Sequence, residues 1–158
     1  VSLWTPAREA RRDSMKLTRL EVLTLASIVE GEALVDDERP VIAGVYLNRL
    51  RLRMALQADP TVQYGMELAT GTRKSRLLTK DYKFPSPYNT YLNPGLPPGP
   101  INSPGTASID AVLNPASVPY LFFVAGPDRR HVFSRTYREH LTAIRRVREG
   151  VLPPPEMN

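Results

Sequence analysis

The segment at residues 22–33, VLTLASIVEGEA, constrains the fold of this chain more than any other, because an almost wholly apolar stretch here ends in two carboxylates. Its apolar side chains cover nearly the whole circumference of a helix, which is typical of a helix buried on all sides. Glu30 lies where that burial ends. Partial loss of hydration disfavours the charged form of a carboxyl group, so we expect the pKa of Glu30 to exceed its usual value of about 4.3. The pattern therefore predicts a general acid at Glu30, and the alternative is that Glu30 and Glu32 only solvate a helix end.

Composition limits the kinds of site that the chain can build. Its 158 residues are enough for one domain with a real core. It has no cysteine and two histidines, which excludes disulfides and thiolate metal sites and argues against a histidine-rich one, so we expect no metal and no cofactor. The net charge of +5 suits an acidic partner such as nucleic acid, anionic lipid or cell-wall polymer, without choosing among them.

Membrane and export signals are missing from the sequence. No apolar run approaches the roughly 20 residues of a membrane span, and the N-terminus lacks a signal-peptide pattern. We therefore expect the chain as given to be soluble, either by itself or as a piece cut from an anchored protein.

The predicted fold class is α+β, with a folded domain at residues 18–150. Residues 1–17 are mixed and basic and form a lead-in segment. The proline-rich residues 151–158 are expected to form a disordered tail. Within the domain we expect two N-terminal helices, a proline-rich loop, a small antiparallel sheet with a β-hairpin, and a C-terminal helix.

Start signals define the two N-terminal helices. Thr18 and Glu21 have the spacing of a capping box, so the first helix should run from residue 18 to about 33. Acidic residues and a proline predict a second helix at about 36–54. Asn48 falls on the apolar stripe of this second helix, where an amide must be hydrogen-bonded. It either ties down a neighbouring loop or contacts a substrate.

The second half of the chain predicts shorter elements. Residues 108–113 form a short helix that a proline ends. Strand-like residues at 120–125 and 131–134 flank a Gly-Pro turn, which predicts a β-hairpin. Thr136 opens a final helix with another capping-box spacing. The arginines on the outer face of that helix are typical of a solvated surface, with contact to an anionic polymer as the second interpretation.

An Asp-Pro turn interrupts the helical pattern at residues 56–65. Gln57, Asp59 and Thr61 can present their side chains from this turn. Capping of the helix that follows is the favoured role for Asp59, and stabilisation of positive charge in a substrate is the other. Residues 70–81 are polar and basic, and we expect them to form an exposed excursion with short strands.

Residues 84–105 contain so many prolines that helix and central strand are excluded, while the loop itself is stiffened. A stiff loop can hold Tyr88, Asn89 and Tyr91 in place. Tyrosine with asparagine offers a flat apolar face and hydrogen-bonding groups, which suits sugar or peptide binding. The alternative is a proline-rich linker.

His131 and Ser134 lie next to the predicted hairpin turn. A Ser-His nucleophilic pair is one interpretation. No serine in the chain has the Gly-x-Ser-x-Gly surroundings of a nucleophile elbow, which argues against that pair.

Several sequence blocks, in order, resemble the YceG-like family of endolytic murein transglycosylases. The blocks are ASIVEGEA (26–33), VYLNRL (45–50), LQADPTVQY (56–64), SPYNTY (86–91), GLPPGPI (95–101), YLFFV (120–124) and HVFS (131–134). The similarity runs from about residue 18 to 142. Ordered blocks at matching spacing are much more specific than one short motif.

The resemblance implies a lyase that cuts peptidoglycan glycan strands between N-acetylmuramic acid and N-acetylglucosamine and leaves a 1,6-anhydro end. One glutamate of the family carries the chemistry, as general acid and then as base, and Glu30 is the position taken to match it. Neither a water nucleophile nor a second catalytic carboxylate is then required. The other candidates are groups that line the glycan cleft (Gln57, Asp59, Thr61, Tyr88, Asn89, Tyr91) and groups that orient or edge it (Glu32, Asn48, His131, Ser134).

The resemblance also implies a cellular setting. Family members usually carry an N-terminal membrane helix and a small LysM-like domain, which places them at the extracytoplasmic face of the bacterial inner membrane. Neither part is recognised here, so the chain resembles the catalytic domain alone. Peptidoglycan strands are the expected partner, with cell-wall synthesis enzymes as candidate protein partners.

Three other functions remain open at this point. They are a glycan-strand hydrolase (muramidase), a non-catalytic peptidoglycan-binding module, and a nucleic-acid binder that uses the arginines near both termini. The last lacks any recognised nucleic-acid motif, so we expect no nucleic-acid partner.

Overall fold

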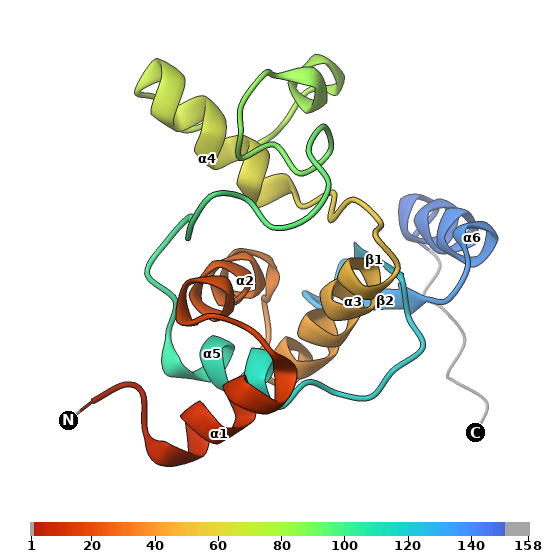
Figure 1. Ribbon diagram of the computed structural model, residues 1–158. Helices are drawn as coiled ribbons and strands as arrows, with labels where there is room; N and C mark the ends of the chain where they lie inside the picture. The colour runs from red at the N-terminus through yellow and green to blue at the C-terminus, as the bar shows by residue number, and fades with distance from the viewer. Residues whose placement is uncertain (1, 151–158) are drawn as a thin grey trace.

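The computed structural model describes residues 2–150; the predicted disordered tail at 151–158 lies outside this range. The described residues form six α-helices and one two-stranded antiparallel sheet, which confirms the predicted α+β class (Figure 1). In chain order the elements are α1 (Pro6–Met15), α2 (Arg19–Glu32), the 3-10 turn η1 (Asp36–Glu38), α3 (Arg39–Arg51), α4 (Asp59–Thr70), the 3-10 turn η2 (Thr79–Lys83), α5 (Thr106–Leu113), β1 (Phe122–Ala125), β2 (His131–Ser134) and α6 (Tyr137–Arg148).

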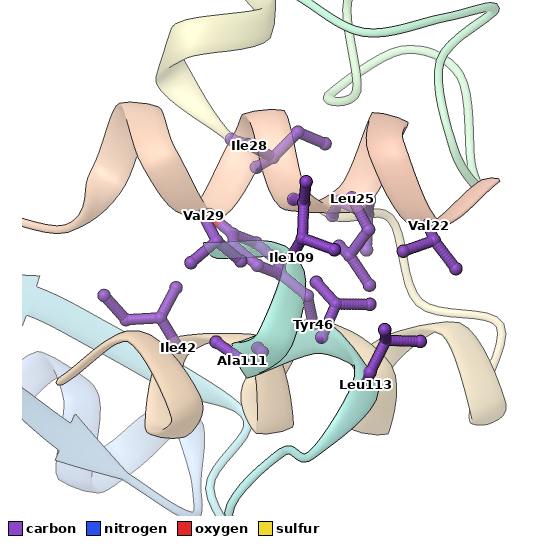
Figure 2. Packing of buried hydrophobic residues seen from close by; sticks show 14 of the residues in the cluster. Val22, Leu25, Ile28, Val29, Ile42, Tyr46, Ile109, Ala111 and Leu113 are labelled. Atoms are coloured by element: carbon purple, nitrogen blue, oxygen red, sulfur yellow. The ribbon is translucent and has the colours of Figure 1, made fainter. Parts of the chain in front are cut away.

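Helix α2 forms the centre of the core, as its sequence predicts. The side chain of Thr18 accepts the N–H of Glu21 at 3.1 Å, and the side chain of Glu21 accepts the N–H of Thr18 at 2.9 Å, so the capping box is complete. Figure 2 shows the apolar side chains of α2, α3 and α5 pointing toward one another. Burial on this scale is the main source of stability for a helix in water.

Helix α3 begins later than predicted, because residues 36–38 form the separate turn η1. A Cβ atom on Gly44 would lie 2.7 Å from the carbonyl oxygen of Ala116. Only glycine at this position therefore lets the segment that contains Ala116 pass so close to α3. Asn48 donates to the carbonyl oxygens of Val118 at 2.8 Å and Tyr120 at 3.0 Å. Of its two predicted roles, the geometry matches the one in which Asn48 ties down a loop.

The region after the Asp-Pro turn differs in part from its prediction. A twelve-residue helix, α4, begins at Asp59. The strands expected at residues 70–81 do not form, and this polar stretch leads into the turn η2. Residues 84–105 contain neither helix nor strand, as the prolines predict, and the loop runs beside α4 (Figure 1).

The lead-in segment contains a helix, α1, that was not predicted from the sequence. Arg8 forms a two-pronged ion pair with Asp110 of α5, at 2.8 and 3.1 Å. Arg11 donates to the carbonyl oxygen of Leu113 at 2.9 Å. No residue of α1 is buried, so the helix has no apolar stripe by which a sequence pattern could find it.

The predicted hairpin and final helix are both confirmed. Strand β1 pairs with β2 in antiparallel register, with Phe123 opposite Phe133. Thr136 caps α6 by accepting the N–H of Glu139 at 3.2 Å. Helix α6 then packs against the hairpin at the right of Figure 1. Across residues 2–150, every helix is too short or too polar to span a bilayer.

Candidate active site

A pocket of about 430 Å³ opens between the end of α2, helix α3, the start of α4, the hairpin and α6. This volume lies in the usual range for small-ligand sites. The predicted site residues that line it are Glu32, Gln57, Asp59, Tyr91 and His131. It is also lined by residues not predicted, among them Tyr46, Arg49, Tyr82, Phe122, Tyr137 and His140. The predicted residues outside its lining are Glu30, Asn48, Thr61, Tyr88, Asn89 and Ser134.

Glu30 is held by donors from two other elements. Its Oε2 accepts from Nη1 of Arg39 at 2.6 Å and from Oγ of Ser108 at 2.7 Å, and its Oε1 accepts the N–H of Gly105 at 3.2 Å. These donors lower the pKa of Glu30, with the Ser108 bond as the largest cause, although burial acts in the opposite direction. The expectation of a raised pKa at Glu30 is therefore wrong, because the end of α2 meets polar groups of α3 and α5.

Glu32 has the property that was expected of Glu30. Burial, and secondly the negative charge of Asp59, raise the pKa of Glu32 to about 7, while a hydrogen bond with Tyr46 opposes the rise. Glu32 follows Leu25, Ile28 and Val29 at helical spacing, so it continues the buried stripe of α2 to the pocket wall. That spacing is the sequence signal that could have singled out Glu32.

Asp59 is clamped by two tyrosines. Its Oδ1 accepts from the hydroxyl of Tyr91 at 2.5 Å, and its Oδ2 accepts from the hydroxyl of Tyr82 at 3.1 Å. The N-cap of α4 is Ala58, which makes no side-chain capping bond, so the favoured capping role of Asp59 is wrong. Its carboxylate belongs to the pocket wall.

Two of the predicted cleft residues are buried supports of the proline-rich loop. Thr61 is fully buried, and its hydroxyl lies 2.8 Å from that of Thr90. Asn89 is also fully buried and donates to the carbonyl oxygen of Tyr82 in η2 at 3.1 Å and to that of Phe84 in the loop at 2.9 Å. Its own Oδ1 accepts the N–H of Tyr91 at 2.9 Å. These bonds fix the loop that carries Tyr91 into the pocket.

Tyr88 and Gln57 lie at different places around the loop. Tyr88 packs edge to face on Tyr64 of α4, with ring centroids 4.9 Å apart, and does not reach the pocket lining. Gln57 has an exposed side chain at the pocket and a left-handed backbone with φ of 50°. Its place leaves it free to contact a ligand.

His131 lines the pocket but already has a partner. Its Nδ1 lies 3.0 Å from Oε1 of Glu38, and both side chains are almost fully buried. Ser134 is three residues further along β2, and an odd spacing on a strand puts two side chains on opposite faces. The Ser-His nucleophilic pair therefore does not form.

Arg49, Phe122 and His140 form a part of the pocket that the sequence pattern did not predict. The ring of His140 stacks on that of Phe122, with ring centroids 5.1 Å apart. The guanidinium of Arg49 also lies over the Phe122 ring, 5.0 Å from its centroid. Arg49 follows Ile42, Val45 and Tyr46 at helical spacing on a buried stripe. A charged residue on such a stripe is the signal that could have revealed it. Within residues 2–150 no group of three or more acidic, histidine or cysteine side chains is arranged to hold a metal ion.

Comparisons with known proteins agree with this architecture. The model of the YceG-like family matches residues 2–146. An endolytic murein transglycosylase of Bacillus subtilis (strain 168) is 44% identical over 135 residues. A protein of the same name from Streptococcus pneumoniae serotype 2 (strain D39 / NCTC 7466) is 36% identical over 127 residues. The crystal structure of a YceG-like protein from Listeria monocytogenes superposes with a TM-score of 0.79 at 41% identity.

Each of these matches covers most of this chain but only part of the other protein. The alignments include 84% of the chain for the Bacillus protein, 80% for the Streptococcus protein and 86% for the Listeria structure. They include 36%, 23% and 43% of those three chains, respectively. The chain thus spans less than half of the length of each relative that it matches.

Proposed function

Because the chain belongs to the YceG-like family, we propose that it is an endolytic murein transglycosylase, a lyase that cleaves peptidoglycan between N-acetylmuramic acid and N-acetylglucosamine. The product would carry a 1,6-anhydro end. The observation that carries this proposal is Glu32, whose pKa is raised to about 7 in a pocket of about 430 Å³. A carboxyl group with such a pKa can give and take a proton near neutral pH.

Glu32 is assigned the role that the family resemblance gave to Glu30. Successive helix residues are about 100° apart, so two glutamates separated by one residue face in nearly opposite directions. Glu30 accepts three hydrogen bonds and pairs with Arg39, which favours its charged form. An acid must be protonated to begin this reaction, and it must reach the sugar. Glu32 meets both requirements better.

The chemistry needs one carboxyl group twice. Protonated Glu32 gives its proton to the glycosidic oxygen while the bond from that oxygen to C1 of the muramic residue breaks, through an oxocarbenium-like state. The N-acetylglucosamine end leaves as an alcohol. Glu32, now a carboxylate, takes the proton of the C6 hydroxyl of the same muramic residue as O6 bonds to C1. The proton balance closes on Glu32, and no water is consumed.

Asp59 supports the positive charge that develops at C1. Its carboxylate lies close enough to Glu32 to raise the pKa of Glu32. Two tyrosine hydroxyls already donate to its oxygens, which keeps them oriented and occupied. Occupied oxygens are poorly suited to attack C1, so the role assigned to Asp59 is electrostatic.

The remaining candidate residues either contact the glycan or support the pocket. Gln57 and Tyr91 contact the glycan from the pocket wall, while His131 shapes its edge through Glu38. The buried Thr61 and Asn89 hold the loop, and Tyr88 packs it against α4. In the cell, the chain would act at the extracytoplasmic face of the inner membrane, beside enzymes of cell-wall synthesis. No cofactor enters any step.

Product analysis with matched variants tests the proposal. The protein, E32Q and E30Q are each incubated with purified peptidoglycan, and released glycans are identified by mass spectrometry. We expect anhydro-ended products from the protein and from E30Q, with E32Q slower by roughly 10² to 10⁴-fold. Full activity in E32Q with loss of activity in E30Q would return the role to Glu30.

A muramidase is the second candidate, because a second carboxylate, Asp59, lies in the same pocket as Glu32. Most glycoside hydrolases use a pair of catalytic carboxyl groups. Products with reducing ends in place of anhydro ends would identify this reaction. Binding to peptidoglycan without any released product would instead identify a wall-binding module.

A further inference from the structure

Arg49 is a buried cation that has no counter-ion among the residues that the structure describes. The residue is 7% exposed. Its Nε donates to the carbonyl oxygen of Leu121 and its Nη1 to that of Ala55, both at 2.7 Å. Among residues 2–150, no carboxylate lies within ion-pair distance of it. A buried charge that lacks an opposite charge is costly, and a ligand can supply what the chain does not.

One nitrogen of Arg49 is left for such a ligand. No hydrogen bond joins Nη2 to another atom of the described residues, whereas the other two nitrogens are committed to backbone carbonyls. The guanidinium lies over the Phe122 ring at 5.0 Å from its centroid, which restricts its plane. Arg49 lines the same pocket as Glu32. The pocket therefore offers a positioned, charged donor that the proposed reaction does not use.

The pocket holds charged groups of both signs, with Glu32 and Asp59 as acids and Arg49 as a cation. Burial, and secondly the positive charge of Arg49, lower the pKa of His140. A lowered pKa keeps His140 neutral near pH 7, so of these two residues Arg49 carries the positive charge. Asp59 is engaged by Tyr82 and Tyr91. An anionic group of a ligand is attracted by Arg49 and repelled by Asp59, so it would settle at Arg49.

We propose that Arg49 binds the lactyl carboxylate of an N-acetylmuramic residue, so that this pocket selects glycan whose muramic residue bears no stem peptide. The inference rests on the proposed function. N-acetylmuramic acid differs from N-acetylglucosamine by a lactyl acid on O3. A stem peptide converts that acid to a neutral amide, which still offers a carbonyl oxygen. A guanidinium binds a carboxylate about twice as strongly as a neutral acceptor, so the free acid is preferred.

Calorimetric titration of the E32Q protein tests this without turnover. The probes are three short glycans of alternating N-acetylglucosamine and N-acetylmuramic acid: the free lactyl acid, its methyl ester, and its amide with L-alaninamide, which adds no carboxylate of its own. We expect the acid to bind roughly tenfold tighter than the ester, with the amide close to the ester. E32Q/R49Q should bind all three with the affinity of the ester.

The controls separate a ligand contact from a structural role. E32Q/R49K keeps the charge and should retain part of the preference for the acid, and thermal unfolding checks that each variant folds. Equal affinity of E32Q for acid and ester would overturn the Arg49 proposal alone, even where R49Q fails to fold. An equal loss of affinity for the acid and for the ester in E32Q/R49Q would also overturn the Arg49 proposal. Absence of binding to all three glycans would overturn it together with the proposed function.

Discussion

The hydroxyl of Tyr91 donates a hydrogen bond of 2.5 Å to Oδ1 of Asp59. Tyr91 belongs to the proline-rich loop and Asp59 opens α4, so this bond joins two segments that are 32 residues apart. Tyr82 completes the arrangement, because its ring meets that of Tyr91 edge to face at 4.7 Å and its hydroxyl reaches the other oxygen of Asp59. The stiffness of the loop thus fixes a charge in the pocket.

Replacement of Tyr91 by phenylalanine removes this bond and keeps the ring. We expect the free energy of unfolding to fall by about 1–2 kcal/mol, since a charged acceptor loses a donor. Glycan cleavage should slow by roughly tenfold, because Asp59 is less well held. Urea denaturation and product release measure the two effects. Y82F is the matched control: it removes the 3.1 Å bond and should give a smaller change in both. Unchanged stability and rate in Y91F would contradict the clamp.

The pH dependence of cleavage reports on Glu32. The reaction starts from the protonated acid, so kcat/KM should fall as pH rises through a pKa of about 7. D59N removes the negative charge that helps to raise this pKa, and the fall should therefore move to lower pH. E67Q serves as the control, since Glu67 lies on the same helix but pairs with Arg73 at 3.1 Å. An unmoved midpoint in D59N would show that Asp59 does not act on Glu32.

Glu30 should affect stability more than chemistry. Its pKa is lowered, so its stabilising effect is present above its usual pKa and is lost as pH falls through the lowered value. E30A should therefore reduce the free energy of unfolding by about 1–3 kcal/mol at pH 7 and by less at pH 3. D36N is the control, because Asp36 bonds the same Arg39 at 3.2 Å but its side chain is 91% exposed. A loss in E30A that does not depend on pH would contradict this account.

Local signals were sufficient for most of the fold. The capping boxes, the Gly-Pro turn and the prolines of residues 84–105 act within a few residues of themselves, and α2, the hairpin and the loop follow from them. Helix α1 has no such local signal of burial. Its arginines bind residues of α5 about 100 positions away, which a sequence pattern does not display.

The candidate site depended on contacts between distant segments. The end of the apolar run points to two carboxyl groups in the last turn of α2, but the choice between Glu30 and Glu32 depends on what each side chain meets. Ser108 and Gly105, which lower the pKa of Glu30, follow it by 78 and 75 residues. Asp59 was interpreted as a cap for a similar reason, since its tyrosine partners lie 23 and 32 residues further on.

The packing of the proline-rich loop on α4 gives a last prediction. A Cβ atom on Gly65 would overlap Ser86, with only 2.8 Å to its Cβ and less to its Oγ. G65A should therefore displace the loop and lower the free energy of unfolding by about 1–3 kcal/mol. Because Tyr91 belongs to the same loop, glycan cleavage should fall as well. The double variant G65A/S86G removes the overlap and should recover part of the stability, whereas S86G alone should only lose the bond from the N–H of Tyr88. Additive losses in urea denaturation would mean that the two residues do not touch in solution.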